Sequence, residues 1–280
     1  MIRLFNGLLT SALLILFAIN GFSQPKNLFD KESSLAFANY LFRSANYEMA
    51  AIEFERLALI DSSNLTDHQF KVVLSYRLAN KLDIGFKRFN EWFPDESSMA
   101  YPINREFAIY LIGLGYFKDA NDFLKETQGI DNDEKLMLLG ISNCFLMDWA
   151  AAETNLNGIK NETHATKRLK EVVADGKKLK FKRPGLAAVL SIVPGLGRVY
   201  TGNYADAGLS ALTIATLAWQ AYTGFDKNGS QSFYGWLMAT FTTAFYAGNI
   251  YGSYRAAQLH NKQKTDALYN KTYSIYRLLD

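Results

Sequence analysis

The first half of the chain repeats apolar residues at the spacing of a helix face. Leu35, Ala38 and Leu41 lie three positions apart, and a comparable stripe recurs in three later segments. The later stripes are Val73, Tyr76 and Leu78; Phe107, Tyr110 and Leu111; and Leu138, Ile141 and Phe145. Such spacing places apolar side chains on one side of an α-helix, so we expect an amphipathic helix at each stripe.

A second kind of segment follows each stripe. In it, a bulky residue is followed three positions later by a small residue, and four positions after that by another bulky residue. The four sets are Tyr47, Ala50 and Phe54; Leu82, Gly85 and Phe89; Phe117, Ala120 and Leu124; and Trp149, Ala152 and Leu156. Successive sets begin 35, 35 and 32 residues apart. A nearly fixed period of this length predicts a stack of helical hairpins.

The small residue has a physical role in this pattern. Where two antiparallel helices cross, a small side chain lets their backbones approach, and the larger neighbours fill the groove beside it. The pattern resembles the tetratricopeptide repeat, a family whose concave surface binds peptides or other proteins. The resemblance implies a repeat domain over residues 24–162 with a protein or peptide partner on its concave face. The tryptophan and glycine of the consensus first helix are mostly absent, so a generic array of helical hairpins is the alternative.

Two long uncharged segments lie in the last third of the chain. Residues 207–225 and 232–254 contain no Asp, Glu, Lys or Arg, and a short polar sequence, DKNGSQ, separates them. Each segment is long enough for a helix to cross a hydrocarbon core of about 30 Å. We therefore expect a two-helix transmembrane hairpin. A helical pair buried in a larger water-soluble core is the alternative.

Small residues in these segments predict close helix packing. One small face recurs every four positions, and Asn249 is the strongly polar side chain beside it. In lipid, helices associate through such small faces, and an asparagine hydrogen-bonds between helices, so the same faces also predict a homo-oligomer. The first face is Ala244, Gly248, Gly252 and Ala256, and the opposing face is Gly208, Ala211, Ala215 and Ala218.

The glycine-rich stretch before the first uncharged segment invites a nucleotide-binding interpretation, which the spacing rejects. Tyr200 occupies the place of the third glycine of a dinucleotide-binding fingerprint, and the Lys and Ser/Thr of a P-loop do not follow Gly202. The apolar run before Pro194 is too short to span a bilayer. We expect it to form an interfacial or re-entrant helix.

The same stretch resembles the TM2-like membrane domains of bacterial envelope proteins. Their hallmark is Pro-Gly-x-Gly-x-x-Tyr-x-Gly, followed by a glycine that opens the first membrane span. The matching residues are Pro194, Gly195, Gly197, Tyr200, Gly202 and Gly208. Arg198 stands where Gln or His is commoner, which leaves the role of that position open. The resemblance implies a membrane domain over residues 184–257, in a family with no settled biochemical activity.

Three remaining segments complete the expected organisation. Residues 1–23 show one cation, an apolar run and small residues at positions 21 and 23, which predicts a cleaved signal peptide, with an uncleaved anchor as the alternative. Residues 163–183 predict a basic linker helix that is attracted to anionic lipid head groups. Residues 258–280 predict a C-terminal tail. Basic residues flank both ends of the hairpin and favour a cytoplasmic location for them, but we give precedence to the signal peptide.

No candidate catalytic or metal site emerges from the sequence. The net charge of +3 gives no reason to expect a nucleic-acid partner. His68, His164 and His260 are far apart and lack the spacing of metal ligands. Cys144 is the single cysteine and lies among apolar residues, which predicts a buried structural thiol. We expect no catalytic activity, no cofactor and no metal.

These observations together predict an all-α protein. A helical-hairpin solenoid is followed by a short interfacial helix and a two-helix transmembrane hairpin. The expected function is a membrane-anchored scaffold or assembly factor of the bacterial cell envelope that contacts membrane lipid and an envelope protein or peptide. The alternative is a membrane hairpin that acts on lipid or solute, with the repeats as a regulatory domain. The expected location is the inner membrane, with the repeats in the periplasm, and the outer membrane is the alternative.

Overall fold

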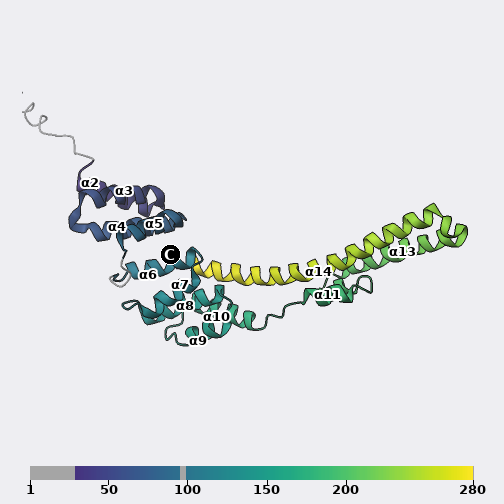
Figure 1. Cartoon of the computed structure of the whole chain (residues 1–280). Helices are drawn as coiled ribbons and strands as arrows, with labels where there is room; N and C mark the ends of the chain where they lie inside the picture. The colour runs from purple at the N-terminus through teal and green to yellow at the C-terminus, as the bar shows by residue number, and fades with distance from the viewer. Residues whose placement is uncertain (1–28, 95–98, 280) are drawn as a thin grey trace, which may run out of the picture. The chain divides into compact units, whose positions relative to one another are not determined.

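The structure is a computed structural model that describes residues 29–94 and 99–279. Within these ranges every regular element is a helix, which confirms the all-α prediction. The chain divides after Ile130 into two compact units, here called unit 1 and unit 2, and each is described by itself (Figure 1). The predicted signal peptide, residues 1–23, lies outside the described residues.

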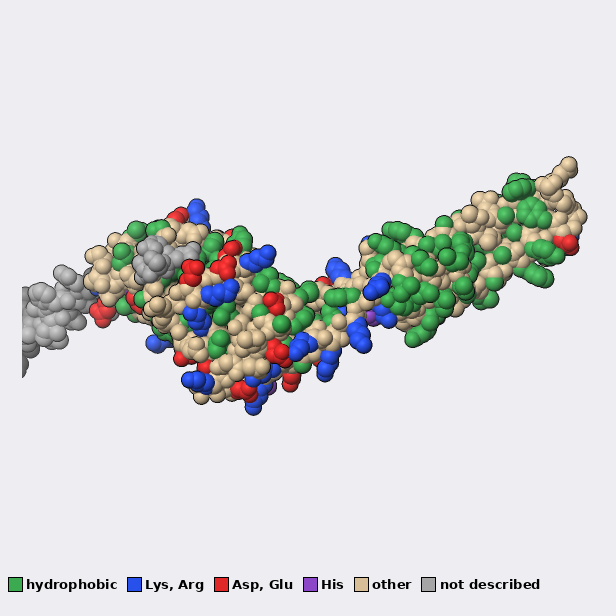
Figure 2. All heavy atoms as spheres, turned by 60° about the horizontal axis from the view of Figure 1, so that its bottom comes forward, with side chains coloured by type: hydrophobic (Ala, Val, Ile, Leu, Met, Phe, Trp, Pro, Cys, Tyr) green, Lys and Arg blue, Asp and Glu red, His purple; other side chains and the backbone are tan. Residues whose placement is uncertain are grey.

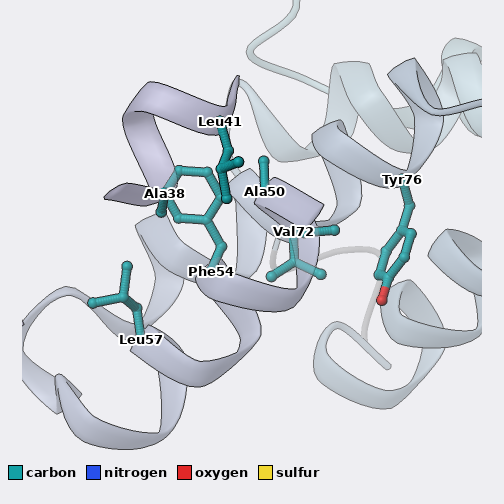
Figure 3. Close-up of a cluster of buried hydrophobic side chains, with 8 residues drawn as sticks. Ala38, Leu41, Ala50, Phe54, Leu57, Val72 and Tyr76 are labelled. Carbon is teal, nitrogen blue, oxygen red and sulfur yellow. The ribbon is translucent and has the colours of Figure 1, made fainter. Parts of the chain in front are cut away.

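Unit 1 contains three helical hairpins, α2–α3, α4–α5 and α6–α7 (Figure 1). Its core begins between α2, α3 and α4, where Leu41, Phe54 and Val72 are buried together (Figure 3). The edge-to-face contact of Phe42 with Phe54, with ring centres 6.4 Å apart, extends this cluster. The helices are α2 (Lys31–Arg43), α3 (Tyr47–Ile60), α4 (Leu65–Leu78), α5 (Leu82–Trp92), α6 (Ile103–Gly113) and α7 (Phe117–Glu126), with a 3₁₀ turn, η1, at Ser62–Asn64.

The turn inside each hairpin has the same backbone form. In the turn after α2, Ala45 has a φ of 57°, its N–H donates to the Phe42 carbonyl, and the Asn46 N–H donates to the Leu41 carbonyl. This pair of hydrogen bonds around a left-handed residue is the Schellman motif, which satisfies the last carbonyls of a helix. The left-handed residue stands two positions before the next helix in the three hairpins of unit 1 and in the hairpin that residues 132–157 form in unit 2. These residues are Ala45, Asn80, Gly115 and Met147.

Unit 2 contains a fourth such hairpin, α8–α9, on which α10 packs, and a second group formed by α11 to α14. In that second group α13 and α14 run side by side as a hairpin closed by the 3₁₀ turn η3 (Figure 1). The elements are α8 (Asn132–Phe145), α9 (Trp149–Asn157), α10 (His164–Lys177), α11 (Pro184–Leu190), α12 (Leu196–Tyr200), α13 (Tyr204–Asn228), η3 (Gly229–Gln231) and α14 (Phe233–Tyr276).

The C-terminal region differs from the tail expected at residues 258–280. Helix α14 continues without interruption to Tyr276 and is 44 residues long. Its last turns pack on α8 and α10, where the Tyr269 ring lies 4.8 Å from that of Phe145 and Lys271 is 2.8 Å from Asp175. Leu268, Thr272 and Ile275 are buried there. A single helix therefore joins the two groups of helices in unit 2.

The expectation of a transmembrane hairpin in residues 184–257 is wrong. None of the helices in the described ranges combines the length and the apolar character that a bilayer crossing requires. The absence of charge in residues 207–225 and 232–254 does not make these segments apolar, because hydropathy is summed over all side chains. Hydroxyl, amide and glycine positions, such as Thr213, Gln220 and Gly248, recur through both helices.

Candidate functional site

The bulky residues that set the repeat period stand at the start of helices. Tyr47, Leu82, Phe117 and Trp149 are the first residues of α3, α5, α7 and α9. The small residue and the second bulky residue of each set are buried. These residues are Ala50 and Phe54, Gly85 and Phe89, Ala120 and Leu124, and Ala152 and Leu156.

Gly85 illustrates why a small residue is needed at this position. The Tyr110 side chain passes over it, and its hydroxyl donates a 2.6 Å hydrogen bond to the Val73 carbonyl. A Cβ on Gly85 would lie 1.8 Å from the Tyr110 hydroxyl oxygen. The contact joins α4, α5 and α6, so the glycine allows two hairpins of unit 1 to interlock.

The glycine-rich turn after α11 is held by Asn249 of α14. The Asn249 side-chain oxygen accepts a 3.2 Å hydrogen bond from the Gly195 N–H. Its side-chain nitrogen donates a 3.0 Å hydrogen bond to the Ser191 carbonyl. Gly195 has a φ of 84°, and a Cβ there would lie 2.4 Å from the Ala207 carbonyl oxygen. The turn therefore requires glycine on two grounds, backbone conformation and contact with α13.

Gly197 lets α12 approach α11 and α14. A Cβ on Gly197 would lie 2.1 Å from the Ala187 carbonyl oxygen and 2.9 Å from the Cβ of Ser253. Ser253 lies one turn beyond Asn249 and is also buried. The short helices α11 and α12 and the middle of α14 thus form one closely packed block.

The other residues of the predicted motif have different positions. The Tyr200 hydroxyl accepts a 3.1 Å hydrogen bond from the Arg183 N–H, so it holds the segment that enters α11. Gly202 has a φ of 87° in the exposed turn before α13. Pro194 is half-buried, and Gly208 is exposed with open space where a Cβ would lie. Gly208 therefore makes no close contact within the chain.

The small face predicted for α14 is displaced by one position. Ala244 and Gly248 are exposed, Gly252 and Ala256 are half-buried, and the buried residues are Asn249, Ser253 and Ala257. Asn249 was expected to bond between the long helices, whereas its partners belong to the turn after α11. Gly252 has a local role, since a Cβ there would lie 2.7 Å from an Arg198 terminal nitrogen.

Asn261 makes a second bidentate link that the sequence analysis missed. Its side-chain oxygen accepts from the Lys182 N–H at 2.8 Å, and its side-chain nitrogen donates to the Lys182 carbonyl at 2.8 Å. The link holds the segment between α10 and α11 against α14. No local pattern around Asn261 marks this role, because its partner lies 79 positions away.

Basic residues from two distant segments come together around this link. We call them the basic collar, and they are Lys178, Lys180, Lys182, Arg183, Arg255, Lys262 and Lys264. Lys178 and Lys180 line the same concavity as Lys264, on the side of α14 near Leu268. His260 lies within the collar, where burial and then the charges of Lys264 and Lys182 lower its pKa. Asp175 and Lys271 line the same concavity, so basic residues outnumber acidic residues there.

The surface of α11 to α14 exposes large apolar side chains. More than half of the exposed large apolar residues in the described ranges lie between Phe181 and Leu259. Trp219, Tyr222 and Trp236 are each about 60 % exposed or more. Figure 2 shows these hydrophobic side chains over the hairpin, with lysine and arginine gathered beside it. A surface of this kind is typical of a binding interface and not of an isolated globular fold.

The histidines, the cysteine and the acidic residues are residue types suited to metal binding or reactive chemistry. No group of three His, Cys, Asp or Glu side chains is placed to hold a metal ion in the part of the chain that the structure describes. Burial raises the pKa of the Cys144 thiol to about 12, so it is not a reactive thiolate. His68 is buried and lies 3.0 Å from Asp61, in the structural junction between α3 and α4.

Comparisons with known protein families, with curated proteins and with solved structures found no match to this chain. The resemblances to the tetratricopeptide repeat and to the TM2-like domain therefore stay predictions.

Proposed function

We propose that this chain is a non-catalytic adaptor of the cell envelope that holds a helical-repeat, protein-binding region at a lipid surface. The observation that supports it most directly is the exposed apolar surface of α11 to α14 beside the basic collar. This proposal uses contact with a lipid surface and requires no helix that crosses the bilayer.

The distribution of side chains in unit 2 fits a lipid surface. Tryptophan and tyrosine favour the boundary between lipid and water, where an apolar ring and a polar edge are both accommodated. The Trp219 and Tyr222 rings lie 6.1 Å apart on one exposed face of α13. Basic residues near a membrane surface each gain about 1 kcal/mol from anionic lipids. The collar and the aromatic side chains therefore contribute two independent attractions.

The repeat region offers its own exposed apolar residues to a protein partner. On α2, Phe37 and Tyr40 lie three positions apart, so they share one face, and they are 47 % and 64 % exposed. Exposed aromatic side chains of this kind are enriched where proteins bind one another. We propose that the hairpins of unit 1 bind a peptide or protein of the envelope.

Vesicle flotation with the full chain tests the lipid contact. The double variant Trp219→Ser/Tyr222→Ser should lose binding to neutral and to anionic phospholipid vesicles. The variant Lys262→Glu/Lys264→Glu should lose binding to anionic vesicles alone, and its loss should be mimicked by high salt. The control Phe37→Ser/Tyr40→Ser removes two exposed rings from unit 1 and should float like the unchanged chain. Equal flotation of all variants would contradict the proposal.

The location in the envelope is tested separately. Removal of residues 1–23 should give a chain that begins at Gln24, which the mass of the protein isolated from cells measures directly. Protease added outside cells with a permeabilised outer membrane should then digest the repeats. An unprocessed chain with fully protected repeats would place the partner in the cytoplasm.

A further inference from the structure

A groove opens between α12, α13 and α14, on the outer side of the block that Asn249 holds. Its volume is about 380 Å³, within the range of about 300–1,000 Å³ typical of small-molecule sites. Ile214 and Phe245 contribute apolar walls from α13 and α14, while Arg198 and Asp206 lie at one end. The lining is mixed, because Leu209, Ile214, Ala244 and Phe245 are apolar, whereas Ser210, Thr213 and Asn249 are polar and Arg198 and Asp206 are charged.

Arg198 lies at the charged end of the groove, between α13 and α14. Its side chain is 23 % exposed, and the missing Cβ of Gly252 makes room for the guanidinium. One terminal nitrogen is 3.0 Å from Asp206, whereas the buried Nε has no hydrogen-bond partner among the described residues. The N-terminus of the 25-residue helix α13 begins at Tyr204, close to Asp206, and adds the positive end of a helix dipole.

Asp206 is a weak competitor for that cation. Its side chain is 58 % exposed, and an ion pair so open to water contributes little to stability. An anionic ligand that also buries an apolar chain in the groove should bind Arg198 more favourably than Asp206 does, because each buried CH₂ group adds hydrophobic stabilisation. The guanidinium can bind a carboxylate or a phosphate through two parallel N–H bonds.

We propose that this groove binds a single-chain amphipath with an anionic head, either a carboxylate or a phosphate. The head lies on Arg198, and the apolar chain lies between Ile214 and Phe245. Gly248 supplies the space for that chain, since it lines the groove and a Cβ on it would meet no atom within 4 Å. This site goes beyond the proposed adaptor function, because it needs a defined, charge-selective groove in place of a general lipid surface.

Photolabelling of the full chain with a diazirine-bearing hexadecanoic acid tests the site. We expect the label on residues 204–214 and 241–250. Excess hexadecanoic acid or hexadecyl phosphate should displace it, whereas hexadecanol should not. Arg198→Gln should reduce labelling about tenfold, equivalent to about 1.4 kcal/mol, and Arg198→Lys should restore part of it. Asp206→Asn should increase labelling, because it removes the competing carboxylate.

Glycine substitutions provide the matched test of the groove itself. Gly248→Leu should abolish labelling by filling the space, and Gly208→Leu should leave it unchanged, because Gly208 is exposed and lies outside the groove. Label spread over α11 to α14 and unaffected by these variants would mean general lipid contact and would overturn this proposal while supporting the adaptor function. Absence of label would also overturn it. Vesicle flotation of Arg198→Gln should be normal, which separates the two proposals.

Discussion

The side-chain amide of Asn249 binds both ends of the turn between α11 and α12, accepting from the Gly195 N–H and donating to the Ser191 carbonyl. The bond distances are 3.2 Å and 3.0 Å, and the asparagine is buried. A buried amide that satisfies one donor and one acceptor fixes the geometry between them. The middle of α14 therefore determines the conformation of a turn 54 positions earlier in the chain.

Loss of this amide should destabilise unit 2. Asn249→Leu leaves a buried N–H and a buried carbonyl without partners, and each costs about 1–3 kcal/mol. Asn249→Asp should also destabilise unit 2 at neutral pH, because a buried carboxylate oxygen would face the Ser191 carbonyl, to which it cannot donate. Urea unfolding followed by circular dichroism measures the change. Asn270→Leu alters an exposed asparagine of the same helix and should change stability by less than about 0.5 kcal/mol. Equal effects of the two leucine variants would contradict the role of Asn249.

Two glycines of the predicted motif should respond to alanine with opposite signs. Gly197→Ala places a Cβ 2.1 Å from the Ala187 carbonyl oxygen, so backbone must move, at a cost of about 1–3 kcal/mol. Gly208→Ala meets open space within α13 and should stabilise the helix by about 0.5–1 kcal/mol. Thermal unfolding of both variants, side by side, provides the measurement. A stabilising Gly197→Ala would show that the contact of α12 with α11 is absent.

The left-handed residues of the hairpin turns offer a route to higher stability. Ala45 is exposed at a φ of 57°, a conformation that costs about 1–2 kcal/mol for a residue with a Cβ. Ala45→Gly should therefore stabilise unit 1 by about 1 kcal/mol. Ser44→Gly, one position earlier at a φ of −81°, gains nothing from glycine and should destabilise it. Chemical unfolding should give a higher free energy of unfolding for Ala45→Gly than for the unchanged chain, and a lower one for Ser44→Gly.

Asp61 should make the stability of unit 1 depend on acid pH. Lys31 is the largest of several hydrogen-bonding influences that hold the pKa of this carboxyl well below its ordinary value, and Ser63, Asn64 and His68 add to it. The unfolded chain then binds a proton more readily than the folded chain does. The contribution of the carboxylate is present above about pH 4 and is lost as the pH falls below it.

The variant Asp61→Asn isolates this effect. It should lower stability at neutral pH, and its stability should fall less steeply than that of the unchanged chain between about pH 4 and pH 2. Unfolding midpoints measured across this range check the slope. Parallel curves for the two chains would mean that Asp61 titrates normally in the folded protein.

The hairpin pattern was predictable from sequence because its determinants are local. Tyr47 and Ala50, or Trp149 and Ala152, lie within one turn of helix, so their spacing alone places them at a helix start and at a close crossing. The partner of a buried polar residue is a different problem. Asn261 bonds the backbone of Lys182, 79 positions earlier in the sequence, and Asn249 bonds a turn 54 to 58 positions earlier. A periodic sequence pattern contains no information about contacts at such separations.

The errors in the last third of the sequence analysis have a common cause. Absence of charge was taken as a measure of apolarity, although serine, threonine, glycine and glutamine lower the hydropathy of α13 and α14. The charges at Arg255, Lys262 and Lys264 were interpreted as the basic flank of a membrane hairpin, with a C-terminal tail from residue 258. In the structure they lie on the exposed side of α14, whose buried side continues to Ile275.

Because α14 is continuous, the directions in which its two packing regions face depend on the number of residues between them. Asn249, Ser253 and Ala257 are buried against α11 and α12, and Leu268, Thr272 and Ile275 are buried against α8 and α10. Each residue turns the helix by about 100°, so one inserted residue between positions 257 and 268 would rotate one set away from its partners. An insertion of seven residues would return the second region to within about 20° of its original direction around the helix axis. The intervening segment can therefore vary in composition much more freely than in length.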